Sequence, residues 1–173
     1  MEINMNELKE INTNDFNCNP FKMLGKDWML ITAENNNKVN TMTASWGGMG
    51  VLWEYDVVYI FIRNSRYTKE FIDASPNFSL TFYDTDKYRK TMGYLGGVSG
   101  RKEDKIAKSE LTLIEEDGIP YFAEANTVIL CEKLSRQKIS PEGILNDELL
   151  TTYYADQDYH EMYIGKILKI MQK

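Results

Sequence analysis

Hydrophobic and polar positions alternate over short stretches of this chain, which is the period of a strand with one buried face. The clearest case is 78–83, where Phe78, Leu80 and Phe82 are each followed by a side chain that carries a hydroxyl. Residues 57–62 form instead an unbroken run of β-branched and aromatic side chains, which predicts a buried strand. Further strand candidates are 28–33, 39–46, 51–53, 111–114, 121–122, 125–133 and 162–171.

Turn-forming residues separate these candidate strands. Residues 34–38 are rich in asparagine, which tolerates left-handed conformations, and predict a turn that joins 28–33 and 39–46 in a hairpin. The glycine-rich stretch 47–50 predicts a break in strand pairing. The expected helices are 69–74, ended by Ser75 and Pro76, 87–95, ended by the glycines that follow, a charged helix or loop at 101–109, and a short helix at 145–154 beside an insertion loop at 135–147.

Six or more short strands with few helices, and no strand–helix–strand rhythm, predict a mainly β protein built as an antiparallel barrel with short helical insertions. The length of 173 residues fits one domain. The first residues are rich in asparagine and weakly periodic. We therefore expect an N-terminal arm at 1–19 and the barrel domain at 20–173.

The charge balance of 20 basic and 26 acidic side chains gives a net charge of −6, which argues against broad binding to nucleic acid or to an anionic membrane. The N-terminus lacks the features of a secretory signal, and no apolar run approaches the length of a membrane span. The two cysteines, Cys18 and Cys131, are in no metal-ligand spacing. A cytoplasmic protein with reduced thiols is expected.

Several kinds of catalytic site are excluded by what the sequence lacks. His160 is the single histidine, so a multi-histidine metal site is excluded and no metal is expected. No nucleophile-elbow or Walker pattern is present. Carboxylates paired in space, as in glycosidases, remain open. These absences favour a protein that takes its reactivity from a cofactor.

A cationic turn follows the buried run 57–62. Arg63, Arg66 and Lys69 stand there without an acidic residue until Glu70, and the hydroxyls of Ser65 and Thr68 lie at an expected helix N-terminus. Such a terminus attracts anions, so the turn predicts a phosphate site. The alternative is a solvated turn whose arginines pair with surface carboxylates.

A row of hydroxyl side chains marks the strand candidate 39–46. Thr41, Thr43 and Ser45 fall on one face of an extended chain. With Trp46 as a wall, such a row could hydrogen-bond the polar edge of a flat heterocycle or a phosphate. The alternative is an ordinary barrel strand with a polar outer face.

Four segments in this order, 40–46, 63–68, 99–105 and 160–167, together resemble the flavin reductase-like, FMN-binding split-barrel family, which includes flavoredoxin. The resemblance covers roughly residues 20 to 170. It implies an antiparallel split β-barrel that pairs into a homodimer and holds FMN near the dimer interface.

The resemblance also implies the site residues. Contacts with the flavin ring and ribityl chain are expected from Asn40, Thr41, Met42, Thr43, Ala44, Ser45 and Trp46, contacts with the FMN phosphate from Arg63, Asn64, Ser65, Arg66, Tyr67 and Thr68, and a covering loop from Ser99, Gly100 and Lys105. His160 resembles a histidine that lies near the nicotinamide in relatives that reduce free flavin. The alternative for His160 is a residue that caps the last strand through a hydrogen bond.

The expected function is that of an FMN flavoprotein, an NAD(P)H-dependent flavin reductase or oxidoreductase that passes hydride or electrons through FMN. NADH or NADPH is the expected donor, and a small molecule or a protein is the expected redox partner. Two alternatives remain. One is a flavoredoxin-like electron carrier with little NAD(P)H oxidation. The other is a non-catalytic nucleic-acid-binding barrel that uses Arg63, Arg66 and Tyr67 as a basic, stacking surface, which the net charge disfavours.

Overall fold

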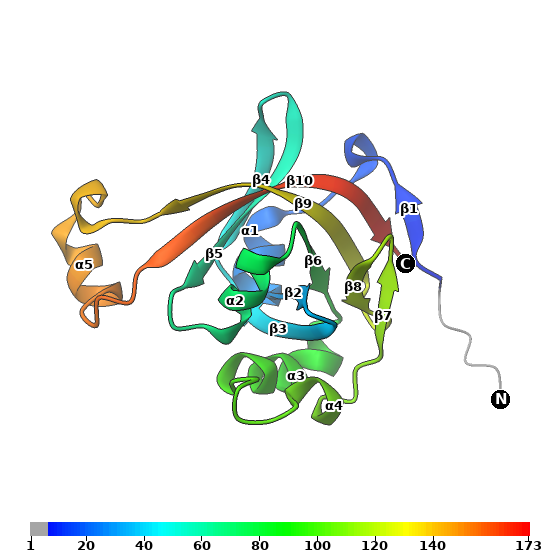
Figure 1. Cartoon of the computed structure of the whole chain (residues 1–173). Helices are drawn as coiled ribbons and strands as arrows, with labels where there is room; N and C mark the ends of the chain where they lie inside the picture. The colour runs from blue at the N-terminus through cyan, green and yellow to red at the C-terminus, as the bar shows by residue number, and fades with distance from the viewer. Residues whose placement is uncertain (1–6) are drawn as a thin grey trace.

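The computed structural model describes residues 7–173, and most of its strands belong to one antiparallel sheet (Figure 1). The order within this sheet is β3-β2-β6-β9-β10-β5-β4, with β1 paired to the C-terminal part of β10 and with β7 and β8 forming a separate hairpin. The strands are β1 (Lys9–Ile11), β2 (Met29–Asn35), β3 (Lys38–Ala44), β4 (Gly47–Leu52), β5 (Tyr55–Arg63), β6 (Asn77–Phe82), β7 (Leu113–Glu116), β8 (Ile119–Phe122), β9 (Thr127–Lys138) and β10 (His160–Gln172).

The sheet curves around a core but is not closed, because β3 and β4 at its two ends do not pair with each other. This confirms the prediction of a mainly β, antiparallel split barrel. The helical segments are short insertions: α1 (Pro20–Lys22), α2 (Tyr67–Ala74), α3 (Thr85–Gly97), α4 (Lys105–Lys108) and α5 (Asp147–Tyr153), with shorter turns η1 (Thr13–Asp15), η2 (Met23–Asp27) and η3 (Pro141–Gly143). No helix in the described part of the chain is long and apolar enough to cross a membrane.

Helix α2 covers one side of the curved sheet and fixes the turn that precedes it. Its Phe71 and Ile72 are buried in the main core cluster beside Ile31, Ile60 and Tyr163. Burying a side chain of this size contributes about 1.5–3 kcal/mol. The turn between β5 and α2 is therefore held at both ends by well-packed elements.

Two glycine-containing segments were predicted to interrupt or end regular structure, but both belong to regular elements. Residues 47–50 do not break the pairing but form the start of β4, opposite β5. A Cβ on Gly47 would lie only 2.6 Å from the Tyr59 carbonyl oxygen, so glycine permits this close approach of strands. Helix α3 likewise continues through Gly96, where a Cβ would lie 3.0 Å from the Thr43 side chain. Both glycines serve close packing and do not end an element.

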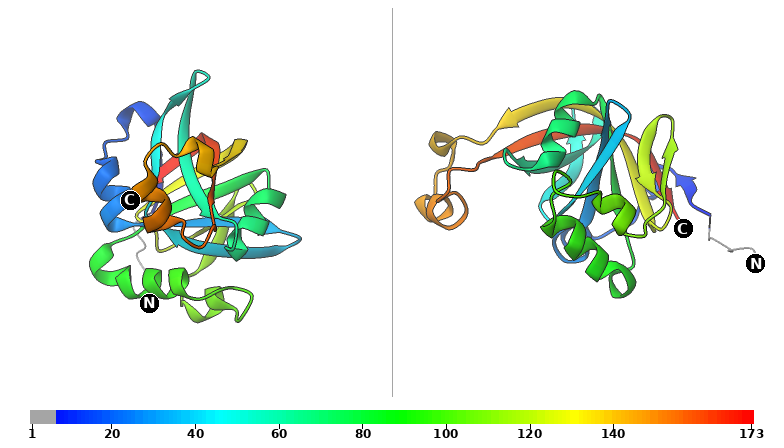
Figure 2. Two further views of the ribbon diagram at one scale, coloured as in Figure 1. Left: turned by 90° about the vertical axis from the view of Figure 1, so that its left-hand side faces the viewer. Right: turned by 60° about the horizontal axis from the view of Figure 1, so that its bottom comes forward.

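The N-terminal arm and the insertion also differ from expectation. Residues 1–6 lie outside the described part, and β1 adds a strand to a stretch expected to be irregular. Strand β9 runs to Lys138, into the stretch expected to be a loop. The ends of β9 and β10 leave the barrel side by side and carry α5 away from it (Figures 1 and 2). We call residues 139–159 the arm; this segment is distinct from the N-terminal arm at 1–19.

Candidate functional site

Two adjoining cavities lie beside β3 and the β5–α2 turn, one of them against the loop that follows α3 and the other against α5 and the start of β10. The first, of about 260 Å³, is called the anion cavity here, and the second, of about 290 Å³, the aromatic cavity. They share Met42, Arg63 and Arg66. The anion cavity is otherwise lined by Asn40, Ser65, Tyr67, Thr68, Gly97, Val98, Ser99, Gly100, Lys105 and Asp156, and the aromatic cavity by Thr43, Ala44, Ser45, Trp46, Phe61, Tyr153 and His160.

The anion cavity receives the N-terminus of α2. The helix begins at Tyr67, two residues earlier than predicted, and Arg66 is its N-cap. Tyr67 and Thr68, in its first turn, both line the cavity. Backbone N–H groups in the first turn have no partner within the helix, and the helix dipole is positive there. The N-terminus of α2 therefore favours the binding of an anion in this cavity.

The two arginines of the turn have different partners. The Arg63 guanidinium donates to the Tyr153 carbonyl oxygen at 2.7 Å and to the Asp158 carbonyl oxygen at 2.9 Å, and it lies 3.4 Å from the Asp156 carboxylate. The Arg66 guanidinium donates to the Gly96 carbonyl oxygen at 3.0 Å, and no carboxylate of the described residues forms an ion pair with it. Arg66 is therefore the guanidinium that remains for an external anion.

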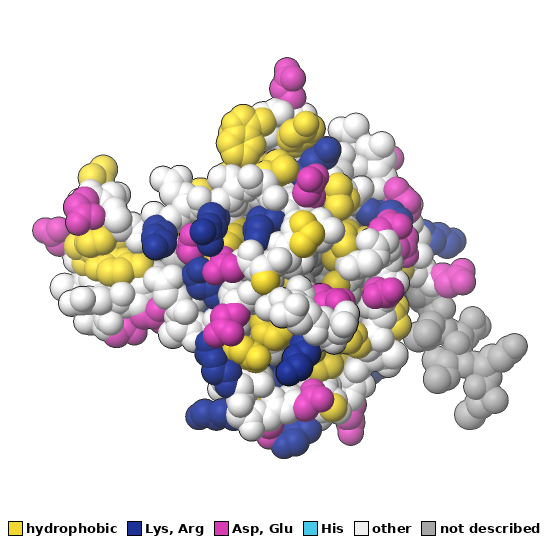
Figure 3. Space-filling view, in the orientation of Figure 1, with side chains coloured by type: hydrophobic (Ala, Val, Ile, Leu, Met, Phe, Trp, Pro, Cys, Tyr) yellow, Lys and Arg dark blue, Asp and Glu magenta, His cyan; other side chains and the backbone are white. Residues whose placement is uncertain are grey.

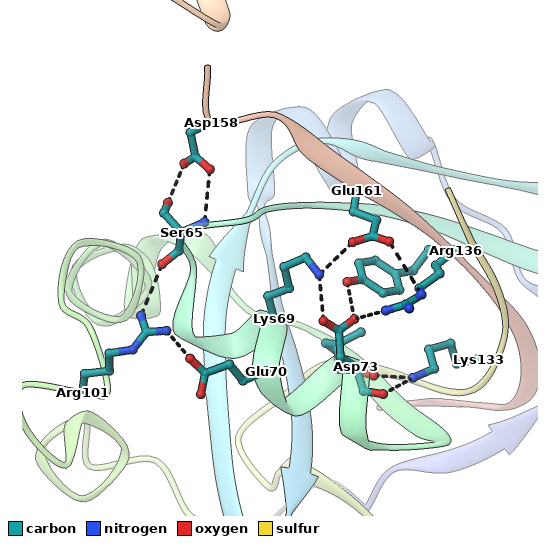
Figure 4. A network of polar contacts seen from close by, with 11 residues as sticks. Ser65, Lys69, Glu70, Asp73, Arg101, Lys133, Arg136, Asp158 and Glu161 are labelled. Carbon is teal, nitrogen blue, oxygen red and sulfur yellow. Dashed lines mark hydrogen bonds and ion pairs between the residues drawn. The ribbon is translucent and has the colours of Figure 1, made fainter. Parts of the chain in front are cut away.

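Ser65 already binds an anion that belongs to the protein. The Asp158 carboxylate accepts hydrogen bonds from the Ser65 backbone N–H at 3.1 Å and from its hydroxyl at 2.5 Å (Figure 4). Arg101 donates to the Ser65 carbonyl oxygen and pairs with Glu70, which holds the covering loop over the turn. The donors predicted to meet a phosphate at Ser65 are thus occupied by the base of the arm.

Buried polar groups complete the floor of the anion cavity. Asn40 donates to the Thr68 hydroxyl at 2.8 Å, and both side chains are buried. Gly100 passes so close to Asn40 that a Cβ there would collide with the amide oxygen. Lys105 is 4% exposed and donates to the carbonyl oxygens of Leu95 and Val98 at the C-terminal end of α3, at 2.7 and 2.9 Å.

Lys105 has no carboxylate partner among the described residues, and this affects its protonation. Burial, and then the positive charge of Arg66, lower the pKa of Lys105 to about 8. Two of its three N–H donors are used by carbonyl oxygens. A third donor and a titratable charge therefore remain on Lys105, which is one of the residues that line the anion cavity.

The aromatic cavity is walled by rings from three parts of the chain. The Trp46 ring lies 5.3 Å from that of Tyr153, edge to face, and 5.1 Å from that of His160. Burial, followed by the charge of Arg63, lowers the pKa of His160 to about 4, so the imidazole is neutral near pH 7. A slot walled by these rings, with Arg63 and Arg66 where it meets the anion cavity, suits a flat ring system.

The predicted hydroxyl row is mostly used within the protein. Thr41 is fully buried, lies 2.9 Å from the Thr32 hydroxyl and donates to the Ile31 carbonyl oxygen. Thr43 donates to the Met92 carbonyl oxygen at 2.5 Å. The cavities nevertheless collect every predicted cofactor residue except Thr41 and Asn64.

The sequence-based prediction missed the residues that the arm contributes. Tyr153 lines the aromatic cavity, Asp156 lines the anion cavity, and Asp158 binds Ser65. These residues are some 90 positions away from the turn along the chain. The cluster of aromatic and acidic residues just before His160 was the one local signal that pointed to them.

Fold and cavities together define a split-barrel protein in which a cavity with basic lining residues adjoins one walled by aromatic rings. Residues 23–173 match the flavin reductase like domain, so the chain belongs to this family. The resemblance inferred from the sequence is confirmed.

Known structures agree with this at the level of the fold. The FMN-binding domain of a flavin reductases-like enzyme from Shewanella baltica superposes with a TM-score of 0.69 at 15% identity, covering 96% of this chain and 77% of that one. Flavoredoxin from Methanosarcina acetivorans gives 0.67 at 21%, covering 96% and 76%. The NADH:FAD oxidoreductase of Streptomyces globisporus gives 0.64 at 15%, covering 85% and 75%. An uncharacterized protein of Archaeoglobus fulgidus is 26% identical over 121 residues, 69% of this chain and 67% of that protein.

Proposed function

We propose that this protein binds FMN, with its phosphate in the anion cavity and its ring in the aromatic cavity, and passes hydride or electrons through it. Arg66 carries the proposal, because it lies where the two cavities meet, beside the N-terminus of α2, and has no carboxylate partner among the described residues. Bound FMN would supply the redox chemistry, and the protein would orient the ring and hold the phosphate.

The residues present fit such a group. A phosphate monoester prefers guanidinium, hydroxyl and backbone donors together, and Arg66, Thr68 and the first turn of α2 offer these. Lys105 adds a second cation on the floor. The cavities of about 260 and 290 Å³ are each slightly smaller than a typical ligand pocket, but they adjoin and together fall within the usual range of roughly 300–1,000 Å³.

The first test is the visible absorption spectrum of the purified protein, with identification of any chromophore released on denaturation. A flavin spectrum and released FMN are expected. A colourless protein that does not bind added FMN would overturn the proposal.

A double variant tests the phosphate assignment. Arg66→Ala with Thr68→Ala is expected to weaken FMN binding by roughly 10²-fold, because a charge-assisted hydrogen bond contributes about 1.5–3 kcal/mol. Fluorescence quenching of FMN gives the dissociation constant. Riboflavin, which lacks the phosphate, should bind the variant and the unmodified protein about equally. Lys90→Ala, an equal change of charge at an exposed residue outside both cavities, is the control. Unchanged FMN affinity in the double variant would contradict the assignment.

The electron donor in this proposal is NADH or NADPH, which would approach the flavin at the aromatic cavity. Anaerobic mixing with each nucleotide tests it by bleaching of the flavin absorption. Rapid bleaching supports a reductase. Bleaching only by a reduced protein partner supports the second candidate, a flavoredoxin-like carrier, which the similarity to flavoredoxin favours.

We propose a homodimer as the assembly. Two projecting parts expose large apolar side chains, the β4–β5 hairpin with Val51 and Trp53 and the arm with Leu145, which is 95% exposed, and Leu149 (Figure 3). Apolar groups gathered on such projections mark interaction sites. Sedimentation should give twice the chain mass of 20.1 kDa, and Leu145→Asp with Leu149→Asp should give the monomer mass. A monomeric unmodified protein would contradict this assembly.

A further inference from the structure

The two ring nitrogens of His160 have different surroundings. Nδ1 lies 2.8 Å from the hydroxyl oxygen of Tyr154. No hydrogen bond from the described residues involves Nε2, and the His160 side chain lines the aromatic cavity. The protein thus occupies one nitrogen and leaves the other for a ligand.

Tyr154 is held rigidly for a residue that follows a short helix. Its backbone N–H donates to the Leu150 carbonyl oxygen at 3.0 Å, and its ring stacks on that of Tyr159 with centroids 4.8 Å apart. The Arg63 guanidinium carbon lies 5.5 Å from the centre of the same ring. The side chain is 9% exposed. Its hydroxyl is therefore fixed against Nδ1 by packing on several sides.

Both partners are neutral near pH 7. Burial raises the pKa of Tyr154, with Arg63 opposing, so the phenol keeps its proton. The pKa of His160 falls to about 4 through burial first and then Arg63 and Arg66, while Asp158 acts in the opposite direction. These are the charged groups that face the imidazole from β5, the turn and the arm. The hydrogen bond between these two neutral groups contains one proton, which is donated either by the Tyr154 hydroxyl or by Nδ1–H of His160.

The direction of this hydrogen bond follows from counting donors and acceptors. If Nδ1–H donated to Tyr154, the buried phenol proton would have no acceptor among the described residues. A buried donor without a partner costs about 1–3 kcal/mol. If Tyr154 donates to Nδ1, its proton is satisfied and the imidazole proton lies on Nε2. The second arrangement leaves no buried donor unpaired.

We propose that Tyr154 is a positioning residue, which donates to Nδ1 and so holds His160 as a hydrogen-bond donor through Nε2–H toward the aromatic cavity. The ligand class that fits is a planar molecule with an acceptor atom, such as a carbonyl oxygen, opposite Nε2. His160 does not act as a general base at this position, because neither nitrogen has a free lone pair facing the cavity. The ligand class rests on the proposed function, and the tautomer does not.

The experiment uses the single histidine of the chain, since ¹⁵N labelling of histidine then reports on His160 alone. Two-bond ¹H–¹⁵N correlation spectra distinguish Nε2–H from Nδ1–H. The full-length protein without flavin should show the Nε2–H form, with signals constant from about pH 5.5 to 8. Tyr154→Phe should reduce the preference for this form by about tenfold, the factor expected for one buried hydrogen bond.

Tyr159→Phe is the matched control, because it removes the neighbouring hydroxyl, which makes no hydrogen bond to the described residues, and keeps the stacked ring. It should leave the tautomer unchanged. An Nδ1–H form in the unmodified protein, or an imidazole that titrates between pH 6 and 7, overturns the proposal without any variant. An equal effect of the two substitutions also overturns it.

The ligand class has its own test. Benzamide, a planar neutral carbonyl compound, is added to the flavin-free protein, in which the aromatic cavity is open, while the Nε2 resonance is followed. A shift at Nε2 in the unmodified protein and none in Tyr154→Phe is expected. Binding without a shift would contradict the ligand class. Failure to bind FMN, seen in the absorption spectrum, would contradict the proposed function and leave the tautomer result intact.

Discussion

Helix α2 lies between two groups of charged residues that differ in their ion pairing. On the cavity side, Arg66 has no carboxylate partner among the described residues. On the opposite side, Lys69 lies 2.7 Å from both Asp73 and Glu161, and Arg136 joins the two carboxylates from β9 (Figure 4). We call this second group the charge cluster. One helix thus presents an unpaired charge on one side and mutually compensated charges on the other.

The protonation of the charge cluster shows that its charges are satisfied internally. Burial alone would lower the pKa of Lys69, but its contacts with Asp73 and Glu161 raise it above the ordinary value. Burial would raise the pKa of Asp73, but hydrogen bonds from Lys69 and Tyr163 lower it. A group paired in this way holds elements together, whereas an unpaired one near a cavity is available to a ligand.

The largest effect is expected from breaking the charge cluster. Asp73→Ala removes a partner of Lys69, Tyr163 and Arg136 at once. Removing one partner from a fully buried pair costs 3–5 kcal/mol, and because the Asp73 side chain is 31% exposed we expect a loss of about 2 kcal/mol in the free energy of unfolding. Urea denaturation measures this loss.

If the two sides of α2 differ as described, substitution of Arg66 should have little effect on stability. Arg66→Ala should change the free energy of unfolding by less than about 0.5 kcal/mol, as is usual for exposed side chains. Folded Asp73→Ala should keep its FMN affinity. If Arg66→Ala destabilised the protein as much as Asp73→Ala, the distinction between the two sides of α2 would be wrong.

A smaller effect is expected from pH, through Lys105. Its folded pKa of about 8 lies below the unfolded value of about 10.4, so the unfolded chain binds more protons between these values. The stability of the flavin-free protein should therefore rise across this range by more than that of Lys105→Met. FMN affinity should fall several-fold from pH 7 to 9, because the charge near the phosphate is lost. Titrations at both pH values test this, and equal pH dependence in Lys105→Met would contradict it.

The sequence predicted the elements of the site but not the partners of its charges. Arg63 and Arg66 look equivalent along the chain, since both stand in the same turn without a nearby acid. The fold decides that Arg63 binds the arm and Arg66 does not. Pairing over this separation follows from the path of β9 and β10 out of the barrel, which local patterns do not encode.

The row of hydroxyl side chains at Thr41, Thr43 and Ser45 is a second case in which the sequence did not predict the hydrogen-bond partners. Strand periodicity describes which side chains share a face, but it does not describe which hydrogen bonds they make. Thr41 and Thr43 donate to carbonyl oxygens of β2 and α3, elements whose positions depend on the whole sheet. The buried runs, the hairpin turn and the cationic turn were predictable because their physics is local.

The Asp158–Ser65 contact affects how fast an anion binds to the Ser65 donors as well as how tightly it binds. The Ser65 donors become accessible only when the Asp158 carboxylate leaves, so an anion that takes them must wait for the base of the arm to open. The same arm carries Leu145 and Leu149. A partner that immobilises the arm would slow exchange of that anion in both directions. If immobilising the arm also changed the affinity for the anion, the anion would change the affinity of the arm for its partner by that same factor.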